Sequence, residues 1–164
     1  MFTLRFDSSQ MDEELKALAG RFEDNTTLHS IMGAALYDQT LERFEREEGP
    51  DGKPWAKLSP LTLASRRSKR GTLRATGGLI RSIKVQVDSS KAEVGTNLNH
   101  PKVWVHQYGA VIRPRRKKAL AIPNGNGGFV FAGKATIPAR PYIGLGRGDE
   151  EAVREALESY LLDD

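Results

Sequence analysis

Residues 138–144 read Pro-Ala-Arg-Pro-Tyr-Ile-Gly, and this stretch constrains the fold more than any other part of the chain. Each proline fixes its own φ angle, removes a backbone N–H donor and keeps the preceding residue extended, so Pro138 and Pro141 predict a stiff segment. Arg140 lies between them on a backbone with little freedom, and no catalytic group stands next to it in sequence. We therefore expect the segment to present Arg140 and Tyr142 to a binding partner.

An amphipathic helix is predicted after this segment. Asp149 can cap its N-terminus, and Glu150 and Glu151 would lie at the positive end of the helix dipole. Its apolar face consists of Val153, Leu157, Tyr160 and Leu161. We expect that face to pack against the rest of the domain.

The N-terminal third predicts a short strand and two helices. Residues 2–6 alternate apolar and polar side chains, as in a strand with one buried face. A first helix with a serine cap follows, with an apolar stripe over residues 11–22. A second helix begins after the capping cluster at 25–27 and ends at Gly49-Pro50-Asp51-Gly52, because proline cannot continue a helix and glycine permits a reversal.

The middle of the chain alternates short elements with turns. Short helices are predicted over 59–65 and 78–82. Residues 103–108 fit either a strand or a short helix, and a short helix ended by Gly109 is favoured. Two antiparallel strand pairs are predicted, 83–88 with 91–96 and 118–123 with 129–132. Trp55, after the turn that ends the second helix, is expected to anchor its loop in the core.

These elements predict an α+β fold. We expect an antiparallel β-sheet or small sandwich packed with two N-terminal helices and one C-terminal helix. Residues 1–164 would form one domain, with a helical part (1–48), a β-rich part with basic loops (49–145) and a C-terminal helix (146–164).

Composition excludes several classes of protein. The 164 residues contain no cysteine, so disulfides and thiolate chemistry are excluded. No run of about 18 apolar residues predicts a membrane span, and the N-terminus lacks the pattern of a signal peptide. We therefore expect a cytoplasmic product without membrane contact.

The net charge of +4 conceals a strong partition along the chain. Residues 1–52 carry a net charge of −7, residues 53–118 carry +14, and residues 119–164 carry −3. A basic middle between acidic ends can face a polyanion. It can equally be neutralised by acidic helices of the same or a neighbouring subunit.

Two basic loops supply much of this positive charge. They contain Arg66, Arg67, Lys69 and Arg70, and Arg113, Arg115, Arg116, Lys117 and Lys118. Clustered Lys and Arg suffice for non-specific DNA binding, although no element that reads sequence accompanies them. The loops could contact DNA, contact an acidic partner, or only face solvent.

No residue pattern predicts catalysis, a metal or a cofactor. His29, His100 and His106 do not have the spacing of metal ligands, and His106 is more typical of a hydrogen bond in a packed turn than of a catalytic base. The glycine-rich run 125–128 is not followed by the Lys-Ser/Thr pair of a phosphate loop. We therefore expect no catalytic residue, no cofactor and no small-molecule substrate.

Five short motifs occur in order between residues 44 and 144. They are Phe44 with Pro50-Asp51-Gly52-Lys53-Pro54-Trp55, Leu73 with Thr76-Gly77-Gly78-Leu79, Val94-Gly95-Thr96-Asn97, His106-Gln107-Tyr108-Gly109, and Ile137-Pro138-Ala139-Arg140-Pro141-Tyr142-Ile143-Gly144. Each is weak alone, but their order and spacing resemble the phage virion morphogenesis (tail completion) family of Mu-like contractile-tailed phages and prophages. The resemblance covers roughly residues 40 to 162.

The resemblance implies a non-enzymatic structural protein that completes tails or joins head and tail. Such neck and tail-completion proteins are small α+β subunits that form rings, often six-fold, at the head-proximal end of the tail. The implied partners are further copies of the chain and other tail or neck proteins. The protein would act in the host cytoplasm during assembly and then remain in the virion.

Contact residues follow from the motifs and the basic loops. For a subunit or partner contact they are Pro138, Arg140, Pro141, Tyr142, Trp55 and His106. The basic loops would face DNA in a channel or an acidic partner ring. The alternative function is that of a stand-alone, non-specific nucleic-acid-binding protein that uses the same loops.

Overall fold

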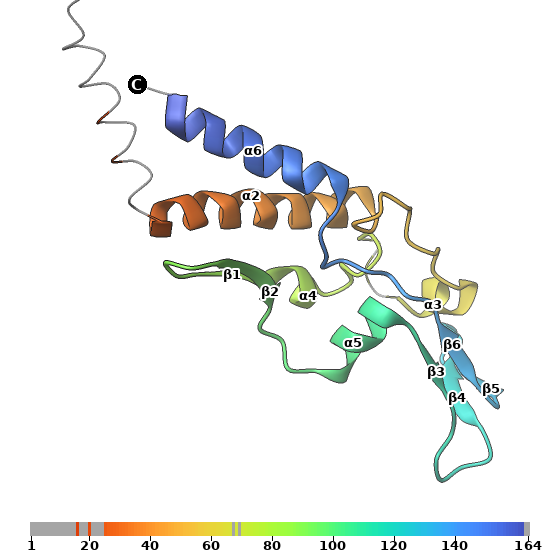
Figure 1. Cartoon of the computed structure of the whole chain (residues 1–164). Helices are drawn as coiled ribbons and strands as arrows, with labels where there is room; N and C mark the ends of the chain where they lie inside the picture. Colours follow the sequence, from red (N-terminus) through yellow and green to blue (C-terminus); the bar gives the residue numbers. More distant parts are fainter. Residues whose placement is uncertain (1–15, 17–19, 21–24, 67, 69, 163–164) are drawn as a thin grey trace, which may run out of the picture.

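The computed structural model describes residues 16, 20, 25–66, 68 and 70–162 (Figure 1). The strand and the first helix predicted before Asn25 lie outside the described residues. The described elements are α2 (Asn25–Arg46), α3 (Pro60–Ser65), α4 (Gly78–Arg81), β1 (Ile83–Val87), β2 (Ala92–Thr96), α5 (Pro101–Tyr108), β3 (Ala110–Ile112), β4 (Leu120–Pro123), β5 (Phe129–Ala132), β6 (Ala135–Ile137) and α6 (Arg147–Leu162). The predicted α+β class is confirmed.

Helix α2 is the central element. Helix α6 packs on one side of it and the β1–β2 hairpin on the other, which gives three layers in Figure 1. Ile83, Val85 and Val87 alternate with exposed residues along β1, so one face of the hairpin is apolar. The close packing depends on Gly33, because a Cβ atom there would come within 2.7 Å of the Val85 Cγ1 atom.

The described strands form three separate two-stranded antiparallel sheets. The pairs β1–β2 and β4–β5 are the two pairs that the sequence predicted. The pair β3–β6 was not predicted, because a strand of three residues is too short to show alternation. The expected single sheet or sandwich is therefore replaced by independent strand pairs.

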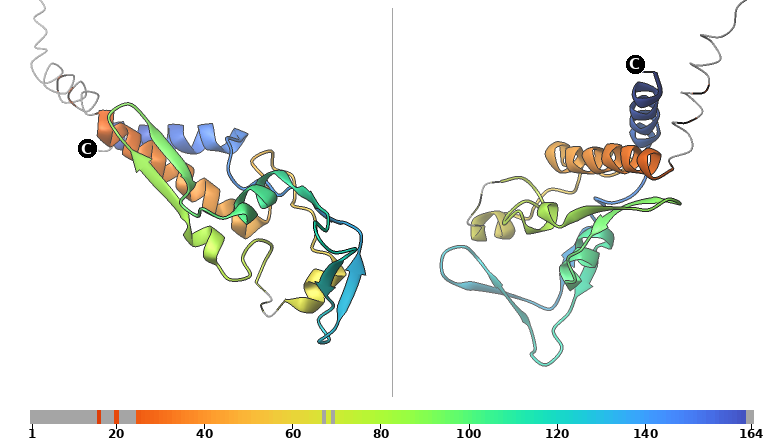
Figure 2. Two further views of the ribbon diagram at one scale, coloured as in Figure 1. Left: turned by 90° about the horizontal axis from the view of Figure 1, so that it is seen from below. Right: turned by 90° about the vertical axis from the view of Figure 1, so that its left-hand side faces the viewer.

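Residues 110–137, which we call the β arm, contain β3, β4, β5 and β6. The arm lies away from α2 and α6, as the two further views in Figure 2 also show. Its base is β3–β6, and the loop at 124–128 touches α3, since a Cβ atom on Gly125 would meet the Ala64 backbone. The arm thus extends from the body instead of adding a layer to it.

The core is small. In the described part of the chain, the buried apolar residues are Phe44, Trp55, Leu79, Ile83, Val103 and Tyr142. The Phe44 ring lies 5.5 Å from the Trp55 ring, edge to face, and 5.6 Å from the Tyr142 ring. This aromatic cluster joins the end of α2 to the loop that follows it and to segment 138–144.

A buried ion pair fixes α6 against α2. The Arg43 Nη2 atom lies 2.5 Å from both carboxylate oxygens of Asp149, and both side chains are almost fully buried. The prediction that Asp149 caps the helix is wrong in position, because α6 already begins at Arg147. The Asp149 carboxylate still accepts a bond from the Gly146 N–H at 2.7 Å, so it stabilises the start of the helix from within the first turn.

We predict that Asp149→Ala lowers the free energy of unfolding by about 3–5 kcal/mol, because it leaves the buried Arg43 guanidinium without its counter-charge. Urea unfolding of the two proteins measures the difference. The matched control is Glu151→Ala, which removes the exposed pair Glu151–Arg154 and should cost at most about 1 kcal/mol. Equal losses for the two variants would show that the buried pair does not hold α6.

Candidate functional site

Segment 138–144 is fixed by side chains from three other parts of the chain. The Trp55 Nε1–H donates to the Pro141 carbonyl at 2.8 Å. The Gln107 amide donates to the Ile143 carbonyl, and Arg43 donates to the Gly144 carbonyl, each at 2.7 Å. These side chains supply donors to carbonyls that have no strand partner, since the segment forms no strand.

The end of α5 lies against the same segment. The Gln107 side-chain carbonyl accepts from the Tyr142 N–H at 3.1 Å and from the Ile143 N–H at 3.3 Å. The Arg140 N–H donates to the His106 carbonyl at 2.7 Å. Gly109, with φ near +75°, permits this approach, since a Cβ atom there would lie 2.8 Å from the Ala139 nitrogen. Two motifs that are distant in sequence therefore form one unit.

The Arg140 side chain points into the body of the chain and is only 4% exposed. Its guanidinium donates to the carbonyls of Ala56 at 2.8 Å and Lys57 at 3.1 Å, which holds the chain after Trp55 in place. Burial lowers the pKa of Arg140, and the charge of Glu47 opposes that shift. Arg140 thus acts as a cationic donor to backbone carbonyls.

The Tyr142 ring is also enclosed, with 1% of the residue exposed. Its hydroxyl donates to the Val103 carbonyl at 3.5 Å. Burial, with a smaller contribution from Tyr108, raises the pKa of Tyr142 to about 12. The phenol therefore stays protonated at physiological pH and serves as a packing group.

The structure places the six residues predicted to contact a partner mostly inside the chain. Trp55, Arg140 and Tyr142 are buried, Pro141 and His106 are half-buried, and Pro138 is exposed. Their observed contacts hold the fold together. The partner contact itself stays a prediction, and the exposed surface available for one lies elsewhere.

His106 is held in its neutral form. Burial is the main cause that lowers the pKa of His106, and the charges of Arg140 and Lys102 lower it further. Its Nδ1 atom is buried without a hydrogen-bond partner. In the part of the chain that the structure describes, no group of three or more His, Cys, Asp or Glu side chains could hold a metal ion.

The two basic loops differ in structure. Arg113, Arg115, Arg116, Lys117 and Lys118 are all exposed, and none forms an ion pair with a described residue. Arg66 instead closes its own loop by donating to the carbonyls of Arg70 and Gly71. Arg70 is exposed, and Arg67 and Lys69 lie outside the described residues. Among the described residues, loop 113–118 therefore presents the more exposed cationic surface.

One face of the β4–β5 pair is apolar and uncovered. Phe129 and Phe131 lie two residues apart on this face of β5, with exposed fractions of 58% and 71%. Their cross-strand neighbours are Pro123 and Ala121, which are exposed as well. The sequence predicted the strand but not the exposure of these phenylalanines, since a Phe-Val-Phe run does not show which face of the strand is covered by the rest of the protein.

Helix α5 carries a second exposed aromatic pair. The Trp104 and Tyr108 rings stack with their centroids 5.9 Å apart, and both residues are about two-thirds exposed. They border a groove of 530 Å³ whose floor includes Tyr142 and Ile143. The signal in the sequence is the aromatic pair at i and i+4, which is visible once the helix is assigned.

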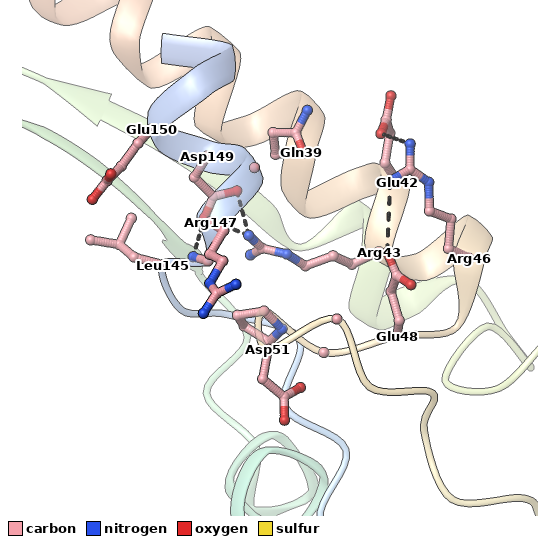
Figure 3. Close-up of a pocket in the computed structure, with 15 residues that line it drawn as sticks. Gln39, Glu42, Arg43, Arg46, Glu48, Asp51, Leu145, Arg147, Asp149 and Glu150 are labelled. Atoms are coloured by element: carbon pink, nitrogen blue, oxygen red, sulfur yellow. Dashed lines mark hydrogen bonds and ion pairs between the residues drawn. The ribbon is translucent and has the colours of Figure 1, made fainter. Parts of the chain in front are cut away.

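A larger hollow of 860 Å³ lies where α2, the loop at 48–52 and the start of α6 meet (Figure 3). Leu145, 80% exposed, borders it together with Pro50. The carboxylates that line it belong to Glu42, Glu48, Asp51, Asp149 and Glu150. Three arginines also line it, so the hollow combines apolar surface with a net negative charge.

These surfaces describe an assembly subunit: a small core, tightly bonded internal motifs and uncovered apolar faces. The chain belongs to the phage virion morphogenesis family, whose model matches residues 6–162. It is 31% identical over 136 residues to the "Putative capsid assembly protein G" of Escherichia phage Mu, covering 77% of this chain and 73% of that relative. No solved structure matches the chain. None of the described helices is long and apolar enough to cross a membrane.

We predict that Arg140→Met lowers the free energy of unfolding by about 2–4 kcal/mol, because the carbonyls of Ala56 and Lys57 lose a charged donor. Urea unfolding measures the loss. Arg113→Met, a change on the exposed loop, should stay within about 0.5 kcal/mol of the parent protein. If both variants were as stable as the parent, Arg140 would not be a core residue.

We predict that His106 makes the protein less stable at acidic pH. Its pKa is lower in the folded than in the unfolded chain, so the unfolded chain binds the proton more tightly. The contribution of His106 to the free energy of unfolding is then unaffected by pH above its pKa in the unfolded chain, about 6.5. As the pH falls below that pKa, the free energy of unfolding decreases. Urea unfolding between pH 7.5 and pH 5 should show a shallower decline for His106→Gln than for the parent. Parallel declines would contradict this assignment.

Proposed function

We propose that the chain is a structural subunit of a ring at the head-proximal end of the phage tail, where it completes the tail and joins it to the head. Membership of a virion morphogenesis family supports a role in assembly. The name of the Mu relative refers to capsid assembly, which is consistent with action near the head. No enzymatic step is part of this proposal.

The observation that carries the proposal is the amount of uncovered apolar surface. Phe129, Phe131, Trp104, Tyr108 and Leu145 are each more than half exposed. Exposed apolar pairs such as Phe129 with Phe131 and Trp104 with Tyr108 are typical of surfaces that contact other proteins. A subunit that completes its buried surface only in an assembly would have this arrangement.

The charge distribution supports contacts between subunits or with other neck and tail proteins. The basic β arm and the acidic surface around α6 belong to different parts of the chain, so opposite charges can meet between molecules. A closed ring, six-fold in the simplest expectation, satisfies every such contact. The subunits would assemble in the host cytoplasm and remain in the virion.

A phage that lacks this chain should produce separate full heads and tails without joined virions. Electron microscopy of the lysate measures the fraction of joined particles. Expression of the parent chain in trans should restore joining. Complete virions from the deletion phage would refute the proposed function.

A second candidate function is non-specific DNA binding, which the exposed, unpaired loop 113–118 favours. Binding of this kind weakens steeply with salt. The test is duplex binding by the monomer and by an Arg115→Ser/Arg116→Ser variant. DNA binding would be a separate activity if the variant lost duplex binding but still supported the joining of heads and tails.

A further inference from the structure

The β arm presents an apolar face and a cationic loop close together in the chain. Phe129 and Phe131 form the centre of the face, with Ala121 and Pro123 beside them. Loop 113–118 leads directly into β4 and has no anionic partner among the described residues. A surface that accepts the arm must therefore be both apolar and acidic.

The hollow at the α2–α6 junction and the adjoining face of α6 meet this description together. Leu145 and Pro50 supply apolar rim, and Glu42, Glu48, Asp51 and Glu150 supply carboxylates (Figure 3). Glu150 and, further along α6, Glu155 and Glu158 are exposed and form no ion pair with a described residue. At the hollow, Arg46 pairs with Glu42 and Glu48, and Lys53 pairs with Asp51. Arg147 also lines the hollow. The unpaired negative charge opposite in sign to the arm therefore lies along α6, beside the hollow.

The arm cannot fill the hollow of its own chain in this structure. The hollow lies where the two long helices meet, whereas the β4–β5 pair lies away from both helices (Figures 1 and 2). Each chain therefore has one unused protruding face and one unused hollow at different places. A contact that joins unlike surfaces of identical chains is heterologous, and it closes into a ring when the rotation between subunits permits.

The areas are consistent with such a contact. Aromatic side chains bury about 150–250 Å² each. Phe129 and Phe131 are 58% and 71% exposed in the single chain, so together they would newly bury about 200–300 Å². A stable interface buries about 800 Å² on each partner. The basic loop along α6 would supply the remainder, with its charges at the polar rim of an apolar centre.

We propose that the β arm of one chain docks on a second copy of the same chain, with Phe129 and Phe131 in the hollow bordered by Leu145 and loop 113–118 along the acidic face of α6. This inference rests on the proposed function, because it takes the chain to be a subunit of an assembly, and it adds which surfaces form the contact. It assigns the arm and the hollow to the subunit contact.

Cysteine crosslinking tests the contact directly, because the chain has no cysteine of its own. The variant carrying both Phe131→Cys and Leu145→Cys is oxidised as the purified full-length chain and in tails isolated from a complemented deletion phage. We expect a ladder of covalent oligomers that ends at one defined size. A mixture of the two single variants, each with a different tag, should give the mixed dimer and nothing larger, because only one bond can form between them.

The matched control pairs Phe131→Cys with Leu162→Cys, since Leu162 is exposed to nearly the same extent as Leu145 but lies at the far end of α6. This pair should not crosslink. A 131–162 crosslink as strong as the 131–145 crosslink would overturn the proposal. Crosslinking of the Phe131→Cys single variant to itself would also overturn it, because that result indicates pairing of one arm with another. Absence of any 131–145 band in both preparations would overturn it as well.

Charge reversal provides an independent test. Arg115→Glu/Arg116→Glu in the arm, or Asp51→Lys/Glu150→Lys at the hollow, should each abolish the ladder, and the two sets combined in one chain should restore it. Failure of the combined variant to restore the ladder would contradict the charge pairing. If the deletion phage still yields unjoined heads and tails, the proposed function stands, and only the contact through the β arm is rejected.

Discussion

The rest of the structure depends on one constraint: the extended segment 138–144 buries Arg140 and Tyr142 but forms no strand. Its carbonyl groups need donors, and a buried carbonyl without one would cost about 1–3 kcal/mol. Trp55, Gln107 and Arg43 supply these donors from three separate parts of the chain. The segment therefore fixes the loop after α2, the end of α5 and the junction of α2 with α6 at the same time.

In this fold, hydrogen bonds and an ion pair hold together segments that a larger protein would hold by burying apolar side chains. Few apolar residues of the described chain are buried, and the Arg43–Asp149 pair lies among them. A buried ion pair adds little net stability compared with an apolar pair, but separating its partners leaves an uncompensated buried charge, so the pair opposes displacement of α6 from α2. The body is consequently well defined in geometry, while substantial apolar surface on the β arm and on α5 remains for other molecules.

The sequence predicted the elements that have a regular pattern and missed interactions that join distant segments. The apolar alternation in residues 83–96 predicted the hairpin correctly. The helix predicted after the cluster at 25–27 was found, but it includes that cluster, because α2 already begins at Asn25. Pro138 and Pro141 predict a stiff segment, but they do not predict a buried Arg140, because nothing local in the sequence shows that the carbonyls of Ala56 and Lys57 lie within its reach. The hollow also escaped prediction, since its walls come from three segments that only the fold brings together.

The same segment connects the two surfaces that we assign to assembly. It begins directly after β6, at the base of the β arm, and it ends at Gly144, next to the Leu145 that borders the hollow. Its bonds to α2, α5 and the loop after α2 leave it little freedom, so the arm base and the hollow keep a fixed relative orientation. In a ring of heterologous contacts, the angle between donor and acceptor surfaces on one subunit determines how many subunits close the ring. In the proposed ring, the stiffness of the Pro-Ala-Arg-Pro run would therefore act on assembly through geometry, although Arg140 and the adjacent Tyr142 are buried within the chain.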